Sequence, residues 1–413
     1  MSNPIGASNG IVLPIPYPPS PTYFPSSINT YNAYPTNFPN FRAAMARLVD
    51  GFADTRTSSA DVPIVYIGDS LTQGAYANSN ITTSTANRGN GTRDICGQMS
   101  KLFNNTSATT KSTRSNCIGT ASTTFDSRIT LNGWDITTAS PPTYYFPGNS
   151  WFFPHDSTAL QFAPLESWDT VDVYFLDNGA GNTVTLQAGS STVSGSLSTH
   201  SSASAMGKIT YTAPAGNAVQ TLKIVNNGSG QSVIAGCDFR IAGTGQIRHI
   251  NLGSSGSTSA NWTDPTQQMY QWLVSMNQPT NVTNGLAIYP ALAVICLFYN
   301  DASLLTPAQY QANLINMIGA CQNGGTTDVC LWNSNNPVTP YAYASNQVDF
   351  NNVLQYISNT YNIPLFNSQQ RWVSYTLATQ SQIGFQNTNN NGHPTGEGYL
   401  DLAKFLFDTF NYL

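Results

Sequence analysis

Ser70 has the chain setting of a serine nucleophile. It lies in the stretch Ile67-Gly-Asp-Ser-Leu-Thr-Gln-Gly74, directly after the short apolar run Val62-Pro-Ile-Val-Tyr-Ile67. Such a run is typical of a strand buried on both faces, and Gly68 lets the chain turn sharply where the strand ends. Open α/β sheets bind ligands beyond the carboxyl ends of their strands, so this serine is well placed for chemistry. The alternative is that Asp69 or Ser70 only caps a following helix.

A serine nucleophile needs a base at neutral pH, and the four histidines are the first candidates. His155 and His200 fall in a segment that has the pattern of short strands, and His249 lies at the end of that segment. His393 instead lies in Asn390-Asn-Gly-His-Pro-Thr-Gly-Glu-Gly-Tyr399, a loop that leads into the last expected helix. Catalytic residues are frequent on loops held by a rigid scaffold, so we predict that His393 is the base.

Two further segments could stabilise the oxyanion that forms when an acyl carbonyl is attacked. Asn251-Leu-Gly-Ser-Ser-Gly-Ser-Thr258 follows a short apolar strand, and Gly256 would present its backbone N–H without a side chain in the way. Phe298-Tyr-Asn-Asp301 follows another strand, and Asn300 could donate its side-chain amide. Each segment alone is also ordinary turn sequence. Together with Ser70 and His393, they can be placed at one edge of a sheet.

The elements around these residues alternate between strand and helix, which predicts a parallel α/β sheet. Strands are expected at 62–67, 291–298, 328–332 and 363–366. Helices are expected within 41–60, at 307–321, at 346–359 and at the C-terminus. Thr306 and Pro307 are typical of an N-cap and a first-turn proline, so they predict the start of the second of these helices. Between about 134 and 247 the pattern changes to short strands separated by Gly-, Asn- and Ser-rich turns, typical of a β-sandwich or jelly roll. The predicted organisation is a Pro-rich extended arm (1–40), an α/β domain in two parts (41–130 and 248–413) and an inserted β-sandwich (131–247).

The four segments resemble the four sequence blocks of the SGNH hydrolase family, also called GDSL esterases. The matching stretches are Gly68–Leu71, Asn251–Gly256, Tyr299–Asp301 and Gly392–Pro394. The resemblance implies a three-layer α/β/α fold with Ser70 as nucleophile and His393 as general base. It also implies an oxyanion hole formed by the Ser70 amide, the Gly256 amide and the Asn300 side chain. Some members of the family, including peptidoglycan and polysaccharide O-acetylesterases, carry a β-rich domain between the first two blocks.

The chain departs from the family pattern in two places. The last block usually reads Asp-x-x-His, but Asn390 occupies the aspartate position. A carboxylate stabilises the imidazolium, which an amide cannot do, and its loss from a triad can cost about 10⁴ in rate. The site is therefore a Ser–His dyad with Asn390 beside it, a triad completed by another acceptor, or the remnant of a lost activity. The second departure is Phe298 in place of a glycine, which is expected to narrow the pocket.

The overall composition limits the classes of partner. Charged residues make up 8% of the chain, against about a quarter in ordinary domains, and the net charge is −5 without a basic run. Nucleic acid is therefore not expected as a partner. No apolar run approaches the roughly 20 residues of a membrane-spanning helix. The six cysteines include no C-x-x-C pair, so we expect neither a metal nor a redox cofactor, and a Cys96–Cys117 disulfide stays open.

The leading hypothesis is a serine esterase that removes O-acetyl groups from a surface polysaccharide. The neutral polar composition and the Pro-rich arm, which does not read as a signal peptide, suggest a phage tail or tailspike component, located on the virion or outside the cell. The arm either binds virion or oligomer partners or is a disordered leader. The competing hypothesis is a glycan-binding surface protein with little or no catalysis. A lipase is disfavoured, and an acyltransferase stays open. Trp151, Phe152 and Phe153 are either core residues or stacking surfaces for sugars.

Overall fold

The structure is a computed structural model of the 413-residue chain. It describes residues 30–31, 35–57, 59–78, 91–106, 111–113, 126–138, 150–154, 159–177, 183–189, 191–192, 197–198, 205–213, 221–227, 233–279, 285–333, 347–372, 385–386 and 393–411. No helix in these ranges has both the length and the apolar character needed to cross a membrane.

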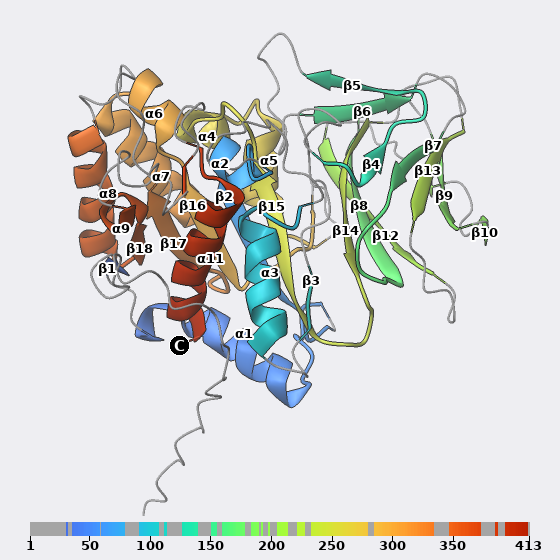
Figure 1. Ribbon diagram of the computed structural model, residues 1–413, viewed down its shortest axis with the longest axis horizontal. Coiled ribbons are helices and arrows are strands. Elements are labelled where there is room, and N and C mark those ends of the chain that lie inside the picture. The colour runs from blue at the N-terminus through green and yellow to red at the C-terminus, as the bar shows by residue number, and fades with distance from the viewer. Residues whose placement is uncertain are drawn as a thin grey trace, which may run out of the picture.

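The predicted parallel sheet forms the centre of the larger part of the molecule (Figure 1). Among the described residues its strand order is β1-β18-β17-β16-β2-β15-β3. All neighbouring pairs are parallel except β1 with β18, which are antiparallel at one edge. The strands are β1 (Thr30–Tyr31), β2 (Val62–Gly68), β3 (Lys111–Thr113), β15 (Gln246–Gly253), β16 (Leu292–Cys296), β17 (Asp328–Asn333) and β18 (Leu365–Asn367).

Helices cover both faces of this sheet, because strand residues that alternate in sequence enter two separate hydrophobic cores. Ile64 and Tyr66 pack under α1, α3 and α11, whereas Val65 and Ile67 pack under α4, α5, α7 and α8. Figure 1 shows α3 and α11 side by side over one face of the sheet. The helices are α1 (Pro39–Asp50), α2 (Ser70–Gln73), α3 (Ile95–Thr106), α4 (Ser259–Thr263), α5 (Gln268–Ser275), α6 (Tyr299–Leu304), α7 (Pro307–Gln322), α8 (Gln347–Tyr361), α9 (Ser368–Trp372) and α11 (Gly396–Asn411).

Local sequence explains where two of these helices begin and end. Thr306 caps α7 by accepting a hydrogen bond from the Gln309 amide, and Pro307 occupies the first turn, as predicted. The first helix ends at Asp50, inside the range 41–60 that was expected to hold a helix and the loop after it. Gly51 follows with φ 73°, the left-handed conformation that commonly terminates helices.

The expected antiparallel insertion is present as two packed sheets (Figure 1, right). Within the described residues, one sheet has the order β10-β9-β13-β7-β4, with β11 also paired to β9, and the other has the order β12-β8-β14-β6-β5. The strands are β4 (Ile129–Thr130), β5 (Trp134–Thr138), β6 (Ser150–Pro154), β7 (Ala159–Phe162), β8 (Thr170–Asp177), β9 (Thr183–Ala188), β10 (Ser191–Thr192), β11 (Leu197–Ser198), β12 (Ala205–Thr212), β13 (Leu222–Asn226) and β14 (Val233–Arg240). The predicted fold class, an α/β/α sheet interrupted by an all-β domain, is confirmed.

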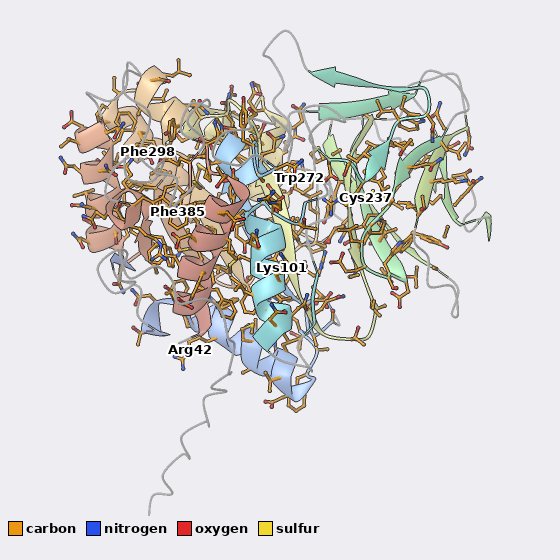
Figure 2. All side chains as sticks on the ribbon, in the orientation of Figure 1. Arg42, Lys101, Cys237, Trp272, Phe298 and Phe385 are labelled. Carbon is orange, nitrogen blue, oxygen red and sulfur yellow. The ribbon has the colours of Figure 1, made fainter. Side chains whose placement is uncertain are left out.

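The sandwich is packed directly against the α/β layers. Tyr174 of β8 contacts Trp272 of α5, with ring centroids 4.7 Å apart, and the Gln271 side chain accepts a hydrogen bond from the Met206 amide at 3.2 Å. Trp272 lies at the border between the two parts in Figure 2. Because Tyr174 and Met206 belong to the same core cluster as Trp272, the contact is an apolar core and not only a polar surface. The predicted domain limits at 40, 130 and 247 stay a prediction, although β1 shows that Thr30 and Tyr31 join the sheet.

Candidate active site

Three parallel strands end level with one another at the edge where the predicted site lies. Gly68 at the end of β2 is opposite Gly253 of β15 on one side and Cys296 of β16 on the other. A Cβ at Gly68 would collide with the Thr72 side chain and the Cys296 carbonyl, so only glycine fits there. The segments that follow these three ends carry Ser70, Gly256 and Asn300, which explains how residues distant in sequence share one edge.

Ser70 is the first residue of the short helix α2. Asp69 caps this helix, because its side chain accepts a hydrogen bond from the Leu71 amide at 2.9 Å. The Ser70 amide is in the first turn, where helix N–H groups have no acceptor within the helix. Ser70 Oγ lies 2.8 Å from His393 Nε2. The structure therefore brings the predicted nucleophile and the predicted base within hydrogen-bond distance.

His393 is held at the start of α11 by contacts on both sides of its loop. Thr395 N donates to the Phe385 carbonyl at 2.9 Å, and Pro394 forms an isolated β-bridge with Gln386. Figure 2 shows Phe385 beside α11. One turn into the helix, the Tyr399 hydroxyl donates to the Leu71 carbonyl at 2.9 Å. This last bond links the helix behind His393 to the helix that carries Ser70.

Tyr76 forms a wall of the site that the sequence did not reveal. Its ring is tilted by 42° against the His393 imidazole, with the centroids 4.9 Å apart. Its φ is 65°, a left-handed conformation that is uncommon for a residue with a bulky side chain. Strained backbone of this kind is frequent at functional sites. A tyrosine carries no sequence signal for positive φ, so only the structure could find this residue.

Burial controls the protonation of His393. It lowers the pKa of the imidazole to about 4, because the charged form loses its hydration. His393 is therefore neutral at pH 7, as a general base must be.

The second sequence block is tied to the first by a set of polar contacts. Asn251 Nδ2 donates to the Thr72 carbonyl at 2.8 Å, and Ser257 Oγ donates to the Gly68 carbonyl at 3.1 Å. Between them the chain turns at Gly256, which has φ 81° and is exposed. Glycine adopts this conformation without strain, so the turn can present backbone N–H groups at the open edge of the sheet.

Asn300 joins the third block to the second. Its Nδ2 donates to the Ser257 carbonyl at 3.0 Å, and the neighbouring Asp301 accepts a hydrogen bond from the Ser259 amide at 2.8 Å. A side-chain amide has two N–H donors, so the bond to Ser257 leaves one for a ligand. Asn300 is thus oriented by the same segment that contains Gly256.

Two carboxyl groups lie buried behind the site. Burial raises the pKa of Asp69 to about 7 and that of Asp301 to about 6, and the charge of Asp301 also raises the pKa of Asp69. Both side chains cap or brace short segments through backbone amides. We assign them to positioning of the Ser70 and Asn300 segments. Asp69 accepts from the amide that follows Ser70, and Asp301, the residue after Asn300, ties that segment to Ser259.

The remaining candidates lie elsewhere. Phe298 is 2% exposed and packs against Phe350 at 6.2 Å, so the expectation that it narrows the pocket is wrong: it is a core residue. His249 is buried on β15, where Nδ1 lies 3.0 Å from the Tyr66 hydroxyl. Outside the described residues are Asn390, His155, His200 and Cys117, and the side chains of Trp151, Phe152 and Phe153 are also outside them.

Comparison with solved structures supports the architecture around this site. The chain is similar to a peptidoglycan O-acetylesterase, with a TM-score of 0.64 and 11% identity, over 94% of this chain and 96% of that one. The chain has the SGNH hydrolase fold. The similarity to the peptidoglycan O-acetylesterase covers the β-sandwich as well as the parallel sheet, since it extends over nearly the whole of both chains.

Other solved structures are similar to smaller parts of this chain. A lipase/acylhydrolase from Enterococcus faecalis is 21% identical over 40% of this chain and 77% of that one, with a TM-score of 0.31. A family two carbohydrate esterase from Clostridium thermocellum, in complex with cellohexaose, is 11% identical over 68% of this chain and 97% of that one, with a TM-score of 0.28. No protein-family model and no curated protein matches the sequence.

Proposed function

We propose that this protein is a serine esterase that removes O-acyl groups, foremost acetyl, from a carbohydrate. The observation that carries the proposal is the 2.8 Å contact between Ser70 Oγ and His393 Nε2 at the carboxyl edge of the parallel sheet. At this distance the imidazole can take the hydroxyl proton while the oxygen attacks a carbonyl carbon.

The reaction proceeds in two halves. In the first, Ser70 Oγ attacks the acyl carbon and His393 Nε2 accepts the hydroxyl proton. The tetrahedral intermediate then expels the sugar oxygen, which takes that proton from His393, and an acyl-Ser70 ester remains. In the second half a water molecule loses a proton to His393 and attacks this ester. The collapse returns the proton to Ser70 and releases the carboxylic acid.

The negative oxygen of each intermediate needs donors that are already in place. The Ser70 amide, the Gly256 amide and the second N–H of the Asn300 side chain are the donors in this proposal. Asn300 is fixed by its bond to Ser257, and Ser257 in turn is fixed to Gly68. A set of donors held in this way loses little energy to reorganisation when the charge develops.

A carbohydrate is the substrate class that the whole-chain similarity favours. The similar protein is a peptidoglycan O-acetylesterase, and it shares the sandwich as well as the parallel sheet. In this proposal the polymer lies across both parts of the molecule, and the acetyl group enters at Ser70.

Hydrolysis of 4-nitrophenyl acetate by the full chain and by Ser70→Ala tests the esterase activity. The proposal expects a rate that Ser70→Ala reduces to background, and equal rates for the two proteins would refute it. Release of acetate from O-acetylated peptidoglycan and from O-acetylated capsular polysaccharide then identifies the polymer. Acetate from a chemically deacetylated sample of each polymer is the control.

The second candidate is a surface glycan-binding protein with little or no catalysis. Asn390 favours it, because the residue that usually stabilises the imidazolium is an amide in this sequence. This candidate predicts retention on immobilised glycan that is the same for the wild type and for Ser70→Ala, with no acetate released. The variant Asn390→Asp separates the two: a marked gain in kcat would show that the chain contains a weakened esterase.

We further propose that the protein belongs to a phage tail or another extracellular assembly. The low share of charged residues and the Pro-rich sequence of residues 1–40, a segment suited to binding a virion or oligomer partner, support this location. Mass spectrometry of purified particles and of the cleared medium tests it. Detection only in the cell interior would contradict the proposal.

A further inference from the structure

A cavity of about 260 Å³ lies at the opposite end of the sheet from Ser70. It is bounded by Asp61 and Pro63 at the start of β2, by Arg248 of β15, and by the face of the sandwich sheet that carries Asp172 and Lys208. Because β2 runs from Val62 to Gly68, its two ends are separated by about 20 Å at the usual rise per residue. The cavity is therefore distinct from the candidate active site.

The inner wall of the cavity is a cluster of buried charges. Three cationic side chains face the Asp172 carboxylate: Lys208 at 3.3 Å, Arg240 at 2.7 Å and Arg248 at 3.5 Å. Together they hold the pKa of Asp172 below its usual range, although burial opposes them. Asp172 also accepts a hydrogen bond from Thr210 Oγ1 at 2.6 Å. One carboxylate thus shares three cations, all of which also line the open space.

Arg248 has a hydrogen-bond donor for which the described part of the chain offers no acceptor. Its Nη2 contacts Asp238, and its Nη1 is 3.9 Å from Asp61. Its Nε, however, is buried without a hydrogen-bond partner among the described residues, and the side chain is only 8% exposed. A buried guanidinium N–H that donates to nothing is costly, so native structures supply it with an acceptor.

The outer wall of the cavity is formed by Arg56, Ala287 and Tyr289. The Arg56 guanidinium lies over the Tyr289 ring at 5.1 Å from its centroid. Tyr289 has φ 48° and Ala287 has φ 49°, and both line the cavity. Two strained residues in one wall must be stabilised by their surroundings, and strain of this kind is concentrated at functional sites.

The balance of charges indicates the chemistry of the ligand. The lining contains four cations, Arg56, Lys208, Arg240 and Arg248, and three carboxylates, Asp54, Asp61 and Asp172. Asp238 lies behind Arg248 and is not part of the lining. Asp238 balances the charge of Arg248, but Arg and Lys are donors only, so the open space faces an excess of N–H groups, among them the Nε of Arg248, unpaired within the described ranges. Such a lining fits an acceptor-rich anion better than a neutral or cationic molecule.

We propose that this cavity binds a small ligand that presents a carboxylate or phosphate group to Arg248 and Arg240, with its polar body against Arg56 and Tyr289. Its volume is close to the lower limit of small-molecule pockets, about 300 Å³. A ligand no larger than a monosaccharide therefore fits. An acidic sugar and a phosphate ester share this chemistry.

Thermal unfolding of the full chain at constant ionic strength tests the proposal with three probes: glucuronate, inorganic phosphate and neutral glucose. A ligand that binds the folded state raises Tm with its concentration. The proposal expects a saturable rise with glucuronate or phosphate and none with glucose. Glucuronate alone points to an acidic sugar, whereas phosphate alone points to a phosphate-bearing ligand. No saturable rise with either anion, or an equal rise with glucose, would overturn it.

Two arginines provide a matched pair of variants. Arg56 and Arg47 both form ion pairs with Asp54, at 2.5 and 3.1 Å, but only Arg56 lines the cavity. Arg56→Ala is expected to weaken binding about tenfold to a hundredfold, as for a lost charged hydrogen bond. Arg47→Ala is expected to bind as the wild type does. Equal effects of the two substitutions on binding would show that the charged residues around the cavity stabilise the fold and do not bind a ligand. The titration repeated on Ser70→Ala gives the same result whether or not the protein is an esterase.

Discussion

Removing the ring of Tyr76 is expected to raise the pKa of His393 and so to move the acid limb of the activity profile upward. The ring lies 4.9 Å from the imidazole, and burial is what lowers the pKa of His393 to about 4. Tyr76→Ala admits water to that side of the imidazole, so the charged form regains hydration. The pKa of His393 can rise at most to about 6.5, the ordinary value for a histidine.

The size of the effect follows from the neutral fraction of His393. With a pKa of about 4, about 97% of the imidazole is neutral at pH 5.5, whereas about 9% would be neutral with a pKa of 6.5. The rate at pH 5.5, relative to that at pH 8, therefore falls by up to tenfold in Tyr76→Ala. Tyr76→Phe keeps the ring and should keep the wild-type profile.

The assay is kcat/KM for 4-nitrophenyl acetate between pH 3.5 and 8, since this parameter reports the pKa of the free enzyme. Samples are quenched into one alkaline buffer, so that the absorbance of nitrophenolate does not vary with the reaction pH. A wild-type acid limb near pH 6.5 would refute the account of His393 as a base desolvated by burial. A limb that stays near pH 4 in Tyr76→Ala would refute the role of Tyr76.

Three other predictions concern the oxyanion donor, a buried acid and a glycine. Asn300→Ala should lower kcat about 10²- to 10³-fold with little change in KM, whereas Ser303→Ala on the same helix should leave kcat unchanged. Equal kcat values for the two variants would show that Asn300 is not part of the oxyanion hole. The pKa of Asp69 is raised in the folded state to about 7, so it favours folding at low pH, and this contribution is lost as pH rises from about 4 through 7. Urea unfolding should show the free energy of unfolding falling across this pH range. The fall should be smaller in Asp69→Asn, whose side chain can still accept from the Leu71 amide. The same dependence on pH in both proteins would contradict the raised pKa of Asp69. Gly68→Ala should lower the free energy of unfolding by about 1–3 kcal/mol or more, because the new methyl group meets the Thr72 side chain and the Cys296 carbonyl. Gly319→Ala should raise Tm slightly, because the new methyl group on α7 meets no other atom and alanine favours the helix. Similar Tm values for the two variants would contradict the close approach at Gly68.

The sequence predicted the layers of this fold because their signals are local. A continuous apolar run defined β2, and Thr306 with Pro307 defined the start of α7. The edge on which the site lies also followed, since carboxyl ends of parallel strands meet at one edge. Ser70 and His393 could be grouped from the sequence because Ser70 follows one of these strand ends and His393 lies in the loop before the last helix.

The rest of the site depends on contacts between distant segments, which leave no local pattern. The positive φ of Tyr76 is imposed by its surroundings and cannot be read from a tyrosine. Phe298 stands where the family has glycine, and only its packing against Phe350 shows that it belongs to the core. The charged cavity is assembled from the segment before β2, the start of β2, β15, three sandwich strands and the segment before β16. Its lining residues are therefore scattered along the chain between Asp54 and Tyr289.

Intact-protein mass spectrometry after brief reaction with 4-nitrophenyl acetate and an acid quench tests the central claim most directly. The account predicts a single added acetyl group that peptide mapping places on Ser70. It also predicts that the adduct is absent from Ser70→Ala and forms far more slowly in His393→Ala. No adduct on Ser70, or equal labelling of the wild type and Ser70→Ala, would contradict the assignment of Ser70 and His393 as nucleophile and base.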